Sequence, residues 1–387
     1  MKNEKLTESK IWRWAFFALA ALGLVIIVVL AQDAGMSGDE HFHYEQAENV
    51  YNYYKTFGKD STAAVVTEKY NLPFYGQSVD NFAYFITKTF NIENVYGARH
   101  IINSIFGWLA MLFVGLIAYR VAGWRAAVIS FILIFLSPRF LGHSFNNLKD
   151  LPLATGMVMG VYFMVCFFQE FPKIRIKTAT FLALAIAFAI SVRIGGLLLF
   201  AYFGLFGAIL YFIRNRKVLF SKQSKQELIK MLGWGIGIAF VAFILAVLTW
   251  PFALKAPIDN MKETLGSMSQ FATAIRQVFE GQMQWSDLLP GYYTPKFIFS
   301  SIPIAVILGL TSFFIMGWKE KKNYFIYSLI IFSFIFPIFW IVYQNSNVYG
   351  GWRHAMFAYP TMVVAAGLGF NLAIEWVTQK VIKKNGN

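Results

Sequence analysis

Long apolar runs separated by short polar segments dominate the sequence. A membrane-spanning helix needs roughly 20 mainly apolar residues, and by this criterion the pattern predicts about ten spans. The predicted spans are 11–32, 97–119, 126–141, 151–171, 179–191, 195–213, 231–250, 297–318, 324–343 and 355–377. The fifth is short because Arg193, Gly195 and Gly196 interrupt one apolar stretch. We therefore expect an all-α integral membrane protein whose residues 1–387 form a single polytopic domain.

The composition agrees with this pattern. Hydrophobic residues make up 57% of the chain and charged residues only 14%, with a mean hydropathy of +0.53. A soluble domain is typically about 45–50% apolar and about 25% charged. The net charge of +14 does not predict nucleic-acid binding, because the basic residues form short clusters between apolar runs. The single cysteine, Cys166, excludes a disulfide framework and a cysteine-based metal site.

The distribution of Lys and Arg predicts the orientation. If the N-terminus is cytoplasmic and the spans alternate, most of the 34 basic residues fall on the cytoplasmic side. Both termini are then cytoplasmic, in an inner or plasma membrane. The first apolar run is longer than the 7–15 residue core of a signal peptide, so we expect an uncleaved first span. Two long loops, 33–96 and 251–296, face the other side and far exceed ordinary helix connections.

An acidic motif, "SGDEHFHYEQ" at 37–46, follows the first span. Asp39 or Glu40 could serve there as a general base; alternatively, the motif is a solvated segment that anchors the span. Glu40 and His43 form a Glu-x-x-His pair, but a di-iron site would need a second such pair, which the sequence lacks. We therefore predict no resident metal, and leave open a Mg²⁺ or Mn²⁺ ion shared with a phosphate.

A second polar segment, "HSFNNLKDLP" at 143–152, precedes the fourth span. It carries His143, Asn146, Asn147, Lys149 and Asp150 within eight residues. Lys149 beside a helix N-terminus is typical of an anion site. Asp150 could instead be a simple helix cap.

Among the basic residues on the predicted non-cytoplasmic side, Arg139, Arg193, Lys296 and Arg353 are candidates for binding a phosphate. Guanidinium and ammonium groups bind phosphate well, although basic residues near span ends also reach lipid head groups. Glycines next to Arg193 and Arg353 permit close backbone approach and favour the ligand-binding interpretation at these two. The aromatic segment "WSDLLPGYYTPKF" at 285–297 is typical of an interfacial belt or of a surface that stacks on a sugar.

Taken in order, these segments resemble the GT-C superfamily of membrane glycosyltransferases, in the branch of protein O-mannosyltransferases and lipid A aminoarabinose transferases. The resemblance rests on "GDEHFHYEQ", "HSFNNLKDLP", "FEGQMQWSDLLPGYYTPK" and "GWRHAMFAYP". It implies a polyprenyl-phosphate-linked sugar as donor, a lipid, protein or glycan acceptor, and chemistry on the non-cytoplasmic face.

The resemblance also implies roles for individual residues. Asp39 is the expected base and Glu40 its support, in a transfer that inverts the configuration of the sugar. The donor phosphate is expected at Arg193, Lys149 and Arg353, with Lys296 as a further candidate. The residues expected to line the substrate site are His43, His143, Asn146, Asn147, Asp150, Tyr293 and His354.

Two other functions fit part of the pattern. A secondary transporter would place ionisable groups near the middle of the bilayer, whereas these spans are almost free of acids. A lipid-linked polysaccharide polymerase or ligase would use the same kind of donor, so the sequence leaves it open.

Overall fold

The computed structural model describes residues 2–67, 70–219, 221–269 and 274–385, and these are almost entirely helical. The α-helices are α1 Lys2–Ala31, α2 Glu40–Lys55, α3 Ser78–Thr89, α4 Val95–Ala122, α5 Trp124–Phe135, α6 Pro138–Asn146, α7 Asp150–Glu170, α8 Ile176–Val192, α9 Leu198–Asn215, α10 Lys222–Leu248, α11 Pro251–Lys255, α12 Asp259–Ser269, α13 Tyr293–Ser301, α14 Ile304–Met316, α15 Tyr324–Tyr343 and α16 Tyr359–Asn385. Short 3-10 helices include η2 Leu72–Phe74, η3 Ile194–Leu197 and η7 Arg353–Ala358. Strands β1 Arg276–Phe279 and β2 Gln282–Trp285 form an antiparallel hairpin.

The structure does not confirm the predicted count of ten membrane spans. Within the described residues, seven helices are long and apolar enough to cross a membrane, or up to nine if two bent helix pairs each count as one span. The predicted span 179–191 corresponds to α8, a shorter apolar helix of 17 residues. Its shortness has a local cause, because Arg193 leaves the helix in an extended conformation before Gly195 and Gly196.

Two predicted spans are bent in the structure. The segment 126–141 divides into α5 and α6, which meet at 69°, and 297–318 divides into α13 and α14, which meet at 108°. Pro138 and Pro303 stand at the start of the second helix of each pair. Proline lacks the N–H that would continue the preceding helix and disfavours helical geometry in the residue before it.

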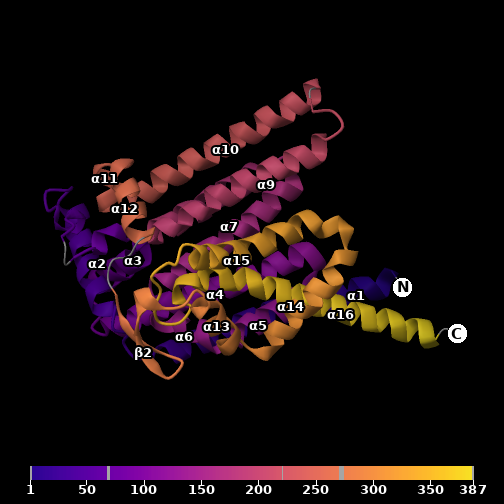
Figure 1. Cartoon of the computed structure of the whole chain (residues 1–387), viewed down its shortest axis with the longest axis horizontal. Helices are drawn as coiled ribbons and strands as arrows, with labels where there is room; N and C mark the ends of the chain where they lie inside the picture. The colour runs from indigo at the N-terminus through magenta and orange to yellow at the C-terminus, as the bar shows by residue number, and fades with distance from the viewer. Residues whose placement is uncertain (1, 68–69, 220, 270–273, 386–387) are drawn as a thin grey trace.

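The segments 33–96 and 251–296, predicted as long loops, contain regular structure. The first contains α2, η2 and α3, and the second contains α11, α12, the β1–β2 hairpin and the start of α13. Figure 1 places both chain termini at one end of the molecule and α2, α3, α11, α12 and the hairpin at the other. This arrangement is consistent with termini on one side of the membrane. Which side that is stays a prediction.

Small residues let α14 and α16 pack closely. A Cβ added to Gly369 on α16 would lie 2.0 Å from the carbonyl oxygen of Gly309 on α14. A Cβ added to Gly309 would lie 2.5 Å from the carbonyl oxygen of Ala366. Backbone-to-backbone packing of this kind is typical of helix contacts in membranes. It fixes α16, which continues directly from η7 and its Arg353.

We therefore expect Gly369→Ala to lower the free energy of unfolding by about 1–3 kcal/mol, the usual effect of overpacking. The matched control is Gly237→Ala on α10, where an added Cβ meets no described atom within 4 Å. Thermal unfolding of the two detergent-purified variants measures the difference. Equal midpoints would contradict the close α14–α16 contact.

Candidate active site

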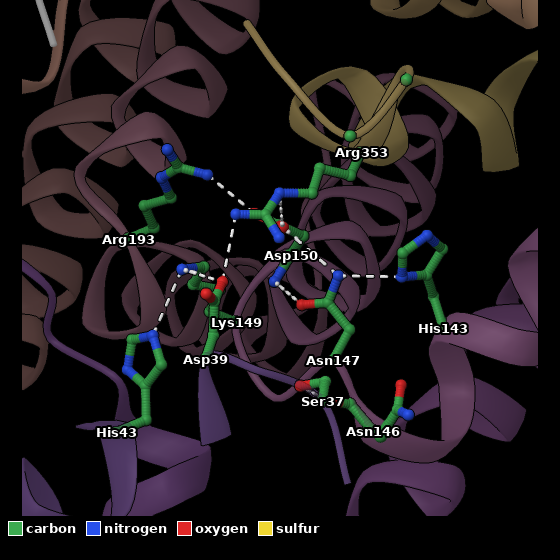
Figure 2. Close-up of polar contacts among 12 residues, drawn as sticks. Ser37, Asp39, His43, His143, Asn146, Asn147, Lys149, Asp150, Arg193 and Arg353 are labelled. Atoms are coloured by element: carbon green, nitrogen blue, oxygen red, sulfur yellow. Dashed lines mark hydrogen bonds and ion pairs between the residues drawn. The ribbon is translucent and has the colours of Figure 1, made fainter. Parts of the chain in front are cut away.

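Side chains from four separate connections converge at one place, which we call the charged cluster (Figure 2). Asp39 precedes α2, Lys149 and Asp150 begin α7, Arg193 follows α8 and Arg353 begins η7. Within the described chain, the charged cluster thus holds three cations and two carboxylates. These are residues that lie far apart in the sequence, and the fold brings them into direct contact.

The cations and carboxylates of the charged cluster alternate. The ammonium of Lys149 donates to Oδ2 of Asp39 at 3.1 Å, and Nη2 of Arg353 donates to the same oxygen at 3.0 Å. Arg193 donates to Oδ1 of Asp150 at 2.7 Å, and Nε of Arg353 lies 3.9 Å from Oδ2 of Asp150. Each carboxylate therefore contacts two cations, and one positive charge remains in excess.

Hydrogen bonds join the connection before α2 to the connection before α7. Asn146 donates its amide to the carbonyl oxygen of Gly35 at 2.8 Å, and the Ser37 hydroxyl donates to the carbonyl oxygen of Asn146 at 3.3 Å. Asn147 accepts from the backbone N–H of Asp150 at 2.9 Å and contacts Nδ1 of His143 at 3.0 Å. Asn146, Asn147 and His143 therefore hold the loops that present Asp39 and Asp150.

The electrostatics keep Asp39 and Lys149 charged. Burial alone would raise the pKa of Asp39, but the charges of Lys149 and Arg353 outweigh it and hold that pKa below its usual range. Burial alone would lower the pKa of Lys149, yet Tyr75, Asp150 and Asp39 raise it above its usual value. At neutral pH the resting site therefore contains a carboxylate paired with an ammonium.

His43 lies beside the charged cluster as a neutral ring. Its Nδ1 donates to Oε1 of Gln77 at 2.8 Å, which leaves Nε2 to accept from the ammonium of Lys149 at 3.2 Å. Burial and the neighbouring Lys149 charge lower the pKa of His43 to about 3. The described residues contain no group of three or more His, Cys, Asp or Glu arranged to hold a metal ion.

A second buried polar set adjoins Asp39 through the next residue of the chain. It consists of Glu40, Asp80, Arg99 and His100. Arg99 donates from Nη1 to the carbonyl oxygen of Glu40 at 3.2 Å and from Nη2 to Asp80. Glu40 accepts from the Ser37 N–H at 3.0 Å and contacts Nε2 of His100 at 2.9 Å. Glu40, a predicted catalytic residue, is only 2% exposed. Its contacts hold the acidic motif in place.

The sequence analysis missed Asp80, Arg99 and His100. Arg99 carries a signal that could have identified it, because it is a charged residue inside the predicted span 97–119. Burial raises the pKa of Asp80 to about 6, although the neighbouring charge of Arg99 opposes this effect. The charged form of the Asp80 carboxylate therefore depends on its ion pair with Arg99.

Other predicted site residues hold the loop before Arg353. The Tyr293 hydroxyl accepts from the N–H of Gly351 at 3.0 Å, and Arg139 donates to the carbonyl oxygen of Gly350. Gly350 and Gly351 have φ values of +67° and +70°, a conformation that favours glycine. Tyr293 and Arg139 therefore act on the backbone that leads to Arg353.

The two remaining predicted residues are Lys296 and His354. Lys296 forms an ion pair with Glu280 of the β1–β2 hairpin. His354 is half-buried next to Arg353, with its ring 4.7 Å from that of Tyr349. Among the contacts of the described residues, the structure therefore does not place Lys296 in the charged cluster.

Comparison with known proteins gives a family match. The family model described as dolichyl-phosphate-mannose-protein mannosyltransferase matches residues 43–258. No curated protein matches the chain. The apo oligosaccharyltransferase of Archaeoglobus fulgidus has a similar fold, with a TM-score of 0.63 and 14% identity over 98% of this chain and 52% of that one.

A second solved structure is also similar. ArnT from Cupriavidus metallidurans bound to undecaprenyl phosphate has a TM-score of 0.60 and 15% identity, over 93% of this chain and 60% of that one. The chain thus spans between half and two thirds of the length of these neighbours. At these identities the likeness shows a shared fold.

The Asp80–Arg99 pair yields a prediction about stability. Arg99→Met should lower the free energy of unfolding by about 3–5 kcal/mol, because it leaves the buried Asp80 carboxylate uncompensated. Adding Asp80→Leu to Arg99→Met should recover a large part of that loss. Thermal unfolding of the wild type, both single variants and the double variant gives the coupling energy. Additive losses in the double variant would contradict the pairing.

Proposed function

Because the chain belongs to the dolichyl-phosphate-mannose–protein mannosyltransferase family, we propose that it transfers a sugar from a polyprenyl-phosphate-linked donor to a hydroxyl acceptor. The family match confirms the resemblance to the GT-C glycosyltransferases on which the prediction rested. We place the reaction on the non-cytoplasmic face of the membrane, at the charged cluster. The two structural neighbours include a protein bound to undecaprenyl phosphate, which supports a donor of this class.

The observation that carries the proposal is the charge balance of the charged cluster. Its cations exceed its carboxylates by one, and two of the cations, Lys149 and Arg353, share a single oxygen of Asp39. A sugar joined to a polyprenol through one phosphate is a phosphodiester with one negative charge. A diphosphate linkage would bring two. The excess charge of the site therefore favours a monophosphate-linked donor.

The transfer follows from the position of Asp39. Its carboxylate takes the proton of the acceptor hydroxyl while that oxygen attacks the anomeric carbon. The bond from the anomeric carbon to the phosphate oxygen breaks on the opposite face, so the configuration at the sugar inverts. Polyprenyl phosphate is a good leaving group without protonation. The second carboxylic acid that inverting glycosidases use as an acid is therefore unnecessary.

Lys149 and Arg353 give this step its stabilisation. As Asp39 gains the proton, it loses its negative charge and releases its hold on both cations. At the same time the departing phosphate goes from one negative charge toward two. The excess positive charge of the site thus increases as the charge of the leaving group increases. Interactions that strengthen toward the transition state are the ones that accelerate a reaction.

The same pairing links the strength of the base to donor binding. In the resting site, Lys149 and Arg353 keep the pKa of Asp39 low, which makes it a weak base. A bound phosphate competes for the same two cations and so raises the proton affinity of Asp39. The acceptor hydroxyl is then activated chiefly when a donor is present.

The first test of the proposal compares the surface glycans of a deletion strain with those of the wild type. We expect a strain that lacks this protein to lose a fixed sugar mass from one surface glycolipid, glycoprotein or glycan. The wild-type gene should restore that mass, and Asp39→Asn should not, since a positioned general base contributes roughly 10²- to 10⁴-fold in rate. Mass spectrometry of envelope lipids, proteins and polymers measures this. A loss confined to long polymer chains would favour a polymerase or ligase instead.

A binding experiment tests the shared cations. Asp39→Asn should bind farnesyl phosphate roughly tenfold more tightly than the wild type, because the variant frees Lys149 and Arg353 from a competing carboxylate. Glu45→Gln is the matched control, since Glu45 is an exposed carboxylate of the same motif that pairs with His41. Titration of the purified protein gives the Kd. Weaker binding by Asp39→Asn would contradict the exchange of counterions.

A further inference from the structure

The segment Tyr75–Gly76–Gln77, between η2 and α3, packs against the end of α8 immediately before Arg193. The N–H of Gln77 donates to the carbonyl oxygen of Val192 at 3.1 Å. A Cβ added to Gly76 would lie 2.1 Å from the carbonyl oxygen of Ser191, so the two backbones touch. The proposed reaction gives this segment no role, yet its side chains point to the cations of the charged cluster.

Gln77 adopts an uncommon conformation. Its φ is +39°, in the left-handed region that non-glycine residues rarely adopt, and its side chain is fully buried. The side-chain amide donates to the carbonyl oxygen of His43 and to Oδ1 of Asn81, both at 3.2 Å. Asn81 in turn donates to the carbonyl oxygen of Gly76 at 3.0 Å. Such strain persists where the surroundings over-determine the conformation, often near functional sites.

The hydrogen bonds of Gln77 determine which way His43 faces. Because the Gln77 amide nitrogen donates to two oxygens, its Oε1 must accept from Nδ1–H of His43, at 2.8 Å. Nε2 of His43 is then the acceptor that the Lys149 ammonium meets at 3.2 Å. Gln77 thus fixes, through His43, the direction in which the ammonium of Lys149 is held.

Tyr75 contacts two of the three cations directly. Nζ of Lys149 lies 5.2 Å and Cζ of Arg193 lies 5.5 Å from the centroid of the Tyr75 ring. The ring is 6% exposed, and its edge meets the ring of His43 at 5.8 Å between centroids. A cation over an aromatic face is attracted by the electron density of the ring, and the attraction is stronger when the pair is desolvated.

We propose that Tyr75 and Gln77 are positioning residues for the donor-phosphate cations Lys149 and Arg193, an inference that rests on the proposed function. Two like charges must be held close together before the donor arrives. A third carboxylate could hold them, but it would cancel the excess positive charge and compete with the phosphate. An aromatic ring and a neutral imidazole attract or orient the cations and leave their charge available.

The experiment measures the Kd of purified full-length protein for farnesyl phosphate and for farnesol, which lacks the phosphate. Tyr75→Leu should weaken binding of farnesyl phosphate roughly tenfold and leave farnesol binding unchanged. Tyr75→Phe keeps the ring and should bind farnesyl phosphate nearly as the wild type does. A loss that affects both ligands equally would mean a merely structural role and overturn the inference.

Gln77→Gly is the second variant. Glycine adopts the left-handed backbone easily, so the change removes the side chain without adding backbone strain. We again expect a roughly tenfold weaker Kd for farnesyl phosphate alone. Wild-type affinity for farnesyl phosphate in folded Tyr75→Leu or Gln77→Gly would overturn the inference and leave the proposed function standing. If the wild type bound the two ligands equally, the proposed function itself would fail.

Discussion

The alternation of charges in the charged cluster is the interaction on which the candidate site depends. Removing an ion from water costs several kcal/mol even after the protein relaxes, and Lys149 and Asp150 are both buried. That cost is offset because each carboxylate contacts two cations. The five residues come from four connections between helices, so these connections must meet at one end of the bundle. No one connection supplies all five residues.

The supporting contacts act mainly on backbone, at the points where a helix is interrupted. Gly196 lies so close to α8 that an added Cβ would be 2.4 Å from the backbone nitrogen of Ile190, and this contact sets the chain direction at Arg193. Tyr293 binds the N–H of Gly351 two residues before Arg353, and Arg99 binds the carbonyl oxygen that follows Asp39. Each charged side chain of the cluster can therefore be held in place although it lies in a connection.

The sequence predicted the parts of this structure that depend on composition and missed those that depend on contacts. Apolar runs located the seven long apolar helices of the described residues, since lipid requires an apolar surface over a known length. They did not predict the bends at Pro138 and Pro303, because the length and hydropathy of an apolar run are the same for a straight helix and a bent pair. Asp39 and Arg353 drew attention as charges beside apolar spans. The residue type of Tyr293 did not predict whether its hydroxyl would contact a ligand or the backbone of a loop.

Tyr75 and Gln77 were missed for a related reason. Both are ordinary residues in a segment predicted as loop, and their importance comes from a left-handed backbone and from what packs around it. Their chemistry explains why neutral groups lie there. The charged cluster has a small excess of positive charge, and any added carboxylate would remove it before a phosphate could use it. Polarisable and neutral partners hold cations in a fixed place without neutralising them, so the positive charge stays available to the phosphate of the proposed donor.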